Sequence, residues 1–69
     1  MEVKTNKILR VDQVANRLNV STRTIYRLLA EGHLMGLRIR GSIRVPEESV
    51  HQYIARQIMK YQLEVGLLE

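Results

Sequence analysis

The chain has 69 residues and no cysteine, so it is expected to form one small domain that neither disulfides nor thiolate metal sites stabilise. It has no apolar signal segment at its start and no stretch of about 18 apolar residues that could span a membrane, which predicts a cytoplasmic protein. The net charge of +4 is uneven, because residues 1–46 carry nine Lys or Arg and three acids, whereas residues 47–69 carry two and four. This clustering of positive charge is typical of a site for a polyanion.

The N-terminal segment, residues 1–8, is mostly polar, and we expect it to be a flexible arm whose last residue, Ile8, enters the core with Leu9. A first helix is expected over about 11–18. The apolar residues of this segment are spaced so that they share one helix face, namely Val11, Val14, Ala15 and Leu18. This face predicts packing against a second element.

A tight turn and a second helix are expected next. Asn19 lies where the chain must turn sharply, since Asn tolerates a positive φ better than most residues. Val20 is expected to fill the corner between the helices, and Ser21 to cap the second helix, over about 22–31. Gly32 suits the position just after a helix end. Two helices joined by so short a turn predict a helix-turn-helix.

The outward side of the second helix carries hydroxyl, phenol and guanidinium groups, which bond phosphates and base edges in DNA. The candidate recognition residues are Ser21, Thr22, Arg23, Thr24, Tyr26 and Arg27. Arg23 and Arg27 lie one turn apart, so one guanidinium could bond a guanine while the other holds a phosphate. The alternative is an ordinary helical hairpin with a solvated basic face, in which Tyr26 is an aromatic residue at the edge of the core.

Residues 37–45 alternate between apolar and polar side chains around a central Gly41, which predicts a β-hairpin with one face on the core. The polar side chains of this hairpin are the candidate DNA contacts of a wing: Arg38, Arg40, Ser42 and Arg44. A basic face that is merely solvated is the alternative to a phosphate-binding wing.

The register of the hairpin depends on the length of its loop. A three-residue loop over 40–42 sets Ile39 opposite Ile43, so that apolar residues share a face, and we favour it. The same loop sets Arg38 opposite Arg44. Two arginines directly opposite each other repel, and a phosphate between them would relieve this repulsion.

A third helix is expected from Pro46, with Glu47 and Glu48 in its first turn, where the helix dipole favours acids. The helix is expected to continue into an extension, residues 57–69, as a candidate segment for self-association or for a protein partner. From Ile54 into this extension, apolar residues recur in heptad-like steps of four and three, at Ile54, Ile58, Tyr61, Val65 and Leu68. Either this extension folds back on the domain, or it pairs with another molecule.

The stretch from Leu9 to about Ile54 contains a series of short motifs. These motifs are Leu9, Val14-Ala15, Val20-Ser21, Arg23-Thr24-Ile25-Tyr26-Arg27, Glu31-Gly32-His33-Leu34, Arg38, Gly41, Arg44 and Val45-Pro46. In these motifs the chain resembles the excisionase family of small DNA-binding domains, relatives of the winged helix-turn-helix part of MerR-type regulators. The chain departs from the family pattern at the turn residue Asn19, at Thr22, where a basic residue is common, and at Ile43, where an aromatic is frequent.

The resemblance implies a winged helix-turn-helix over residues 9–56, mainly α-helical, with three helices and a small two-stranded β-hairpin as the wing. It implies that the second helix enters the major groove and that the wing reaches the neighbouring backbone or minor groove. It further implies an excisionase, or recombination directionality factor, that binds repeated sites cooperatively and bends DNA to steer an integrase.

Two other functions fit the same sequence. One is a small transcriptional regulator with the same fold, and the other is a protein interaction module that acts through the C-terminal helix. An enzyme is not expected, because Asp12 is the single Asp and no nucleophile–base set can be assembled. We expect no metal, since His33 and His51 follow no ligand spacing, and no cofactor. The expected partner is double-stranded DNA in the nucleoid, together with an integrase or further copies of the chain.

Overall fold

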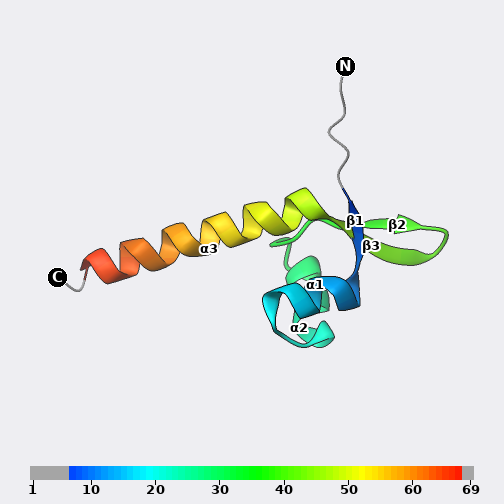
Figure 1. Cartoon of the computed structure of the whole chain (residues 1–69), viewed down its shortest axis with the longest axis horizontal. Helices are drawn as coiled ribbons and strands as arrows, with labels where there is room; N and C mark the ends of the chain where they lie inside the picture. The colour runs from blue at the N-terminus through cyan, green and yellow to red at the C-terminus, as the bar shows by residue number, and fades with distance from the viewer. Residues whose placement is uncertain (1–6, 68–69) are drawn as a thin grey trace, which may run out of the picture.

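The computed structural model describes residues 7–67, so the predicted arm lies almost wholly outside the described residues. The elements follow in the order β1 (Ile8–Arg10), α1 (Val11–Leu18), α2 (Thr22–Ala30), β2 (Leu37–Ile39), β3 (Ser42–Pro46) and α3 (Glu47–Leu67). Figure 1 shows α1 and α2 together on one side of the sheet, with the β2–β3 hairpin and the far end of α3 pointing in opposite directions. Three helices and a hairpin wing make this a winged helix-turn-helix, as predicted.

The sheet has three antiparallel strands rather than the two that the sequence predicted, in the order β1-β3-β2. In β1, Leu9 lies opposite Val45, and both side chains are buried, whereas Ile8 lies opposite Pro46 and is 48% exposed. The expectation that Ile8 enters the core is therefore wrong. The reason is the alternation of side chains along a strand, which directs neighbouring residues to opposite faces of the sheet.

The predicted register of the hairpin is also wrong. The strands are joined by a two-residue turn, Arg40-Gly41, with positive φ at both residues (49° and 85°), as in a type I′ turn. Ile39 consequently pairs with Ser42, and Arg38 pairs with Ile43, so that Arg38 and Arg44 lie on opposite faces of the sheet. Because Arg40 adopts the left-handed conformation, the loop is one residue shorter than predicted.

The turn between α1 and α2 has the predicted backbone. Asn19 lies in the left-handed region (φ 57°, ψ 45°), and the Val20 amide donates to the Ala15 carbonyl at 3.0 Å. Val20 itself is 41% exposed, so the expectation that it fills the corner between the helices is wrong. The corner is instead closed by backbone hydrogen bonds, namely the one from Val20 to Ala15 and the one from the Asn19 amide to the Asn16 carbonyl at 3.2 Å.

Both ends of α2 are fixed by local hydrogen bonds. At its start, the Ser21 hydroxyl accepts a hydrogen bond from the Thr24 amide at 3.2 Å, the predicted N-cap. At its end, Gly32 has a φ of 83°, and the His33 amide donates to the Leu28 carbonyl at 2.8 Å, as in a Schellman motif. These bonds set the length and direction of the helix that carries the candidate recognition residues.

The core is small, and every element except β2 contributes to it. The buried apolar side chains are Leu9, Val11, Val14, Ala15, Ile25, Leu34, Val45 and Val50. Leu18, Leu28, Leu29, Ile43 and Tyr53 pack around this cluster. With no Phe or Trp in the chain, branched aliphatic side chains supply nearly all of the apolar contact.

Three side-chain contacts, together with a backbone hydrogen bond from the Glu47 amide to the Lys7 carbonyl at 2.9 Å, tie α3 to the rest of the domain. The buried Ser49 hydroxyl accepts a hydrogen bond from the Met35 amide at 2.8 Å, and Arg56 donates to the His33 carbonyl at 2.7 Å. Arg17 of α1 forms an ion pair with Glu47 at 2.7 Å. The first half of α3 is thus held by both α1 and the connector between α2 and β2.

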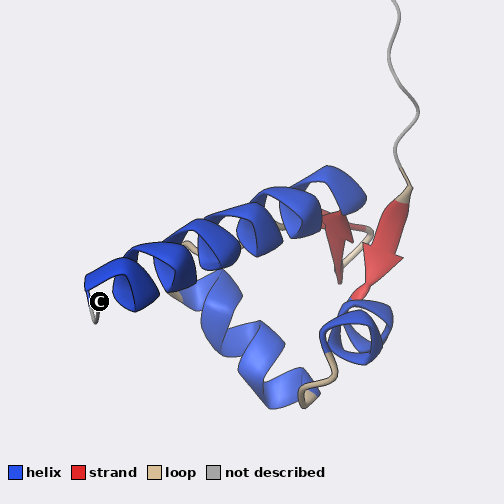
Figure 2. Cartoon of the chain, turned by 60° about the vertical axis from the view of Figure 1, so that its left-hand side comes forward, coloured by secondary structure: helices blue, strands red, loops and turns tan. Residues whose placement is uncertain are grey.

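The second half of α3 continues as one unbroken helix and does not fold back on the domain (Figures 1 and 2). Ile58 is 53% exposed and Tyr61 is 66% exposed. Of the two arrangements that the sequence left open, folding back is therefore wrong.

We predict that Ser49→Ala lowers the free energy of unfolding by about 1 kcal/mol, because the Met35 amide loses its acceptor. Chemical denaturation of the full chain measures this difference. Ser42→Ala is the matched control, since the Ser42 side chain is exposed. An equal loss in both variants would contradict the assignment.

The pKa of Glu47 is lowered from its ordinary value of 4.5 mainly because Arg17 donates a hydrogen bond to the carboxylate, against the opposing effect of burial. A lowered pKa in the folded state stabilises the fold above the ordinary value, and this contribution is lost as the pH falls through the lowered pKa. Glu47→Gln should therefore melt below the wild type at neutral pH, and the difference should close below pH 4.5. Glu48→Gln removes a neighbouring charge from the same helix turn and should show a smaller difference.

Candidate nucleic-acid interface

The outward face of α2 carries two exposed guanidinium groups one helical turn apart, those of Arg23 and Arg27. Neither forms a hydrogen bond or ion pair with another residue in the described part of the chain, 7–67. The helix buries its opposite side through Ile25. Both arginines therefore present their charge to solvent, as a helix that enters a DNA groove requires.

A second stripe on α2 faces the wing. Thr22 and Tyr26, four residues apart, line one side of a surface hollow, and Tyr26 is 50% exposed. The whole lining of this hollow is Arg10, Val11, Asp12, Thr22, Tyr26, Arg38, Gly41, Ser42, Ile43 and Arg44. The hollow thus joins the candidate recognition helix to the wing in one continuous surface.

The remaining two recognition candidates have a structural role at the start of α2. The Ser21 hydroxyl caps the helix, and it lies 3.2 Å from the Thr24 hydroxyl. These two hydroxyls hold the start of the helix. The side chains that α2 exposes for contact with DNA are those of Thr22, Arg23, Tyr26 and Arg27.

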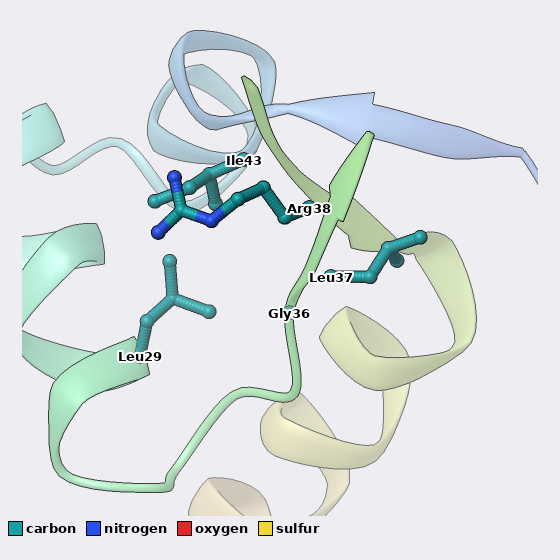
Figure 3. A pocket seen from close by; sticks show the side chains of 5 residues that line it. All are labelled: Leu29, Gly36, Leu37, Arg38 and Ile43. Atoms are coloured by element: carbon teal, nitrogen blue, oxygen red, sulfur yellow. The ribbon is translucent and has the colours of Figure 1, made fainter. Parts of the chain in front are cut away.

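Three of the four predicted wing residues line the hollow, and the fourth, Arg40, is exposed in the turn at the tip of the hairpin. The Arg38 side chain extends from β2 toward α2, so that its guanidinium lies near Leu29 and Ile43 (Figure 3), and its Nη1 donates to the Gly41 carbonyl at 3.4 Å. Arg44 is half-buried, and its Nη1 donates to the Ile43 carbonyl at 3.1 Å.

The structure adds Arg10, which is not among the interface residues that the sequence predicted. Arg10 lies directly opposite Arg44 in the pairing of β1 with β3, and its Nε is 3.2 Å from the Asp12 carboxylate. The predicted pairing of Arg38 with Arg44 is therefore wrong, and Arg44 instead lies opposite Arg10 in the pairing of β1 with β3. The only signal for it in the sequence was the position of Arg10 just after Leu9, in a strand too short to show a period.

The described part of the chain, residues 7–67, contains neither a candidate metal site nor a candidate membrane-spanning helix. No group of three or more His, Cys, Asp or Glu side chains that could hold a metal ion occurs within residues 7–67. None of the helices in that range is long and apolar enough to cross a membrane.

An arginine-bearing helix after a tight turn, flanked by an arginine-bearing hairpin, defines a DNA-binding protein of the winged helix-turn-helix class. Residues 8–58 match the model of the helix-turn-helix domain family, and the chain belongs to this family. No curated protein and no solved structure gives a significant match to the chain. Family membership implies sequence-specific binding of double-stranded DNA, and such domains are typically non-enzymatic.

Proposed function

We propose that the chain is an excisionase-type architectural protein, which binds repeated DNA sites cooperatively and bends the DNA to steer a site-specific integrase. Its α2 enters the major groove, with Arg23 and Arg27 at the base edges and Thr22 and Tyr26 at the groove wall. The wing residues Arg38, Arg40, Ser42 and Arg44, joined by Arg10, hold the phosphates beside that groove.

The observation that carries the proposal is that α2, with its two exposed arginines Arg23 and Arg27, lies beside a hollow lined by further arginines. These are Arg10 of β1 and Arg38 and Arg44 of the hairpin. DNA phosphates that bind beside these guanidinium groups would accept charge-assisted hydrogen bonds from them. A surface that wraps a groove and its flanking backbone also favours bent DNA, because bending increases the contact.

The small size of the domain supports cooperative binding. A single module of this kind buries roughly 600–1,000 Å² of protein surface on DNA, which limits its affinity for one site. Several copies on neighbouring sites gain affinity because each bound copy lowers the elastic cost of bending for the next.

Footprinting on the DNA around the gene for this chain, combined with a gel assay of DNA bending, tests the proposal. Clustered, cooperatively filled sites beside an attachment site, together with bent DNA, are expected. A single unbent site over a promoter would instead assign the chain as a transcriptional regulator. An affinity that is weak, independent of salt and equal on random DNA would favour a protein interaction module.

We predict that Arg23→Ala weakens binding to the preferred site by about 1–3 kcal/mol and relaxes base preference at one or two positions. The physical reason is the loss of a bidentate guanidinium contact to a base edge. In vitro selection of DNA by both proteins, followed by titration of the selected sites, measures the effect. If the variant lost the same affinity for selected and random DNA, Arg23 would be a phosphate contact.

Arg40→Ala should weaken binding evenly across sequences and reduce the slope of log K against log salt by about 1, because one phosphate contact is lost. The measurement is a salt titration on specific and random DNA. Lys60→Ala removes the same charge from an exposed position on α3 and should leave the slope unchanged. An unchanged slope for Arg40→Ala would remove the turn of the wing from the interface.

A further inference from the structure

Asp12 places a carboxylate on a surface whose other charged side chains are arginines. It lines the hollow between α2 and the wing, together with Arg10, Arg38 and Arg44. Among residues 7–67, no other Asp or Glu lines this hollow. A carboxylate repels the phosphates of DNA, so the charge of Asp12 by itself weakens binding at the candidate interface.

Asp12 also holds the side chain of Arg10. Its Oδ1 accepts a hydrogen bond from the Arg10 Nε at 3.2 Å. The backbone of Arg10 is fixed as well, because its amide donates to the Gln13 Oε1 at 2.9 Å and because Arg10 pairs with Arg44 between β1 and β3. Arg10 is therefore anchored at its backbone and at its guanidinium.

The anchored guanidinium keeps donors for a second partner. A guanidinium carries its N–H groups in a planar fork, and the contact with Asp12 uses the one on Nε. Within residues 7–67, the Nη1 and Nη2 groups of Arg10 donate no hydrogen bond. The side chains of Arg10 and Asp12 are 57% and 65% exposed, so a phosphate can reach both. Arg10 can thus bond a phosphate through its Nη edge while Asp12 holds Nε.

We propose that Asp12 is a positioning residue that makes DNA binding more selective, an inference that rests on the proposed function. It holds Arg10 in one orientation, in which the Nη edge meets a single backbone phosphate. On the preferred site, the base contacts of α2 fix where that phosphate lies, and Arg10 then stands between it and the carboxylate.

Random DNA lacks the base contacts that fix its position on α2. Its phosphates therefore lie at varying places along the hollow, where they meet the Asp12 carboxylate without Arg10 in between. An unpaired charge that opposes the wrong partner in this way adds to specificity without adding to affinity. Asp12 should accordingly lower the affinity for random DNA more than the affinity for the preferred site.

A purely structural role of Asp12 has a different signature. Asp12 lies in the first turn of α1, where the helix dipole favours an acid, so its loss also destabilises the start of this helix. That effect changes how much of the protein is folded, and not which DNA the folded protein prefers. The ratio of the affinities for two DNAs, measured on one protein, is therefore insensitive to it, because the folded fraction cancels.

Titration of the full chain with the site selected in vitro and with random DNA tests the role of Asp12. Asp12→Asn should raise the affinity for random DNA by about three- to fivefold, the size of one exposed charge interaction, and the affinity for the selected site by about twofold or less. Glu31→Gln is the matched control, because it removes the same charge from an exposed carboxylate that does not line the hollow. Equal affinity ratios in the two variants would overturn the proposal.

A double-mutant cycle tests whether Asp12 acts through Arg10. Without the Arg10 guanidinium, the carboxylate opposes both DNAs alike, so Asp12→Asn should change the affinity ratio in the wild type and leave it unchanged in Arg10→Ala. Circular dichroism confirms that all four proteins are folded. If Asp12→Asn changed the ratio to the same extent in both backgrounds, Asp12 would not act by positioning Arg10, and the proposal would be wrong.

Nuclear magnetic resonance of the protein without DNA observes the anchor itself. The Arg10 Nε–H signal should shift and exchange faster with water in Asp12→Asn, whereas that of Arg40 at the tip of the hairpin should not change. An Arg10 signal that Asp12→Asn leaves unchanged would overturn the proposal. A wild type that prefers no sequence would overturn the proposed function as well, whereas a preference that survives intact in Asp12→Asn would overturn only the role of Asp12.

Discussion

The fold depends on the central position of β3 in a sheet of only three strands. β3 pairs with β1 on one side and β2 on the other, and its Val45 is fully buried in the core. Because side chains alternate along a strand, the burial of Val45 fixes which face Arg44 occupies. Pro46 ends the strand and leads directly into α3, so the same strand also sets the direction of the long helix. The packing of Val45 thus fixes the faces of the wing, while α3 is held further by the contacts of Ser49, Arg56 and Glu47.

Much of the helix-turn-helix could be predicted from the sequence, because its signals are local. The left-handed Asn19, the Ser21 cap and Gly32 after α2 each act within a few residues of their position, and α1 and α2 begin where predicted. The sheet was less predictable. β1 has three residues, too few to show a period, and it pairs with a strand more than thirty residues away. The hairpin loop was misjudged by one residue, because Arg40 takes a conformation that Gly usually occupies.

For the candidate interface, too, the residues could be predicted from local patterns in the sequence, whereas their arrangement depends on contacts between distant segments. The arginines of α2 follow from the helix and its apolar face, and the wing arginines follow from the alternation around Gly41. Their relation to one another depends on the register of the sheet. That register separates Arg38 from Arg44 and sets Arg10 opposite Arg44. The charge pattern along the chain therefore predicts the residues of the candidate interface, while the strand pairing decides which of them lie opposite each other.

The long α3 serves the domain with one half and leaves the other half unsupported. Val50 is fully buried, and the apolar face that includes it continues through Ile54 and Ile58, which line a hollow beside Leu18 of α1. A helix end without tertiary contacts is marginally stable in water, and Gly66 weakens it further. The end of α3 therefore carries an exposed apolar face that nothing in the described part of the chain covers.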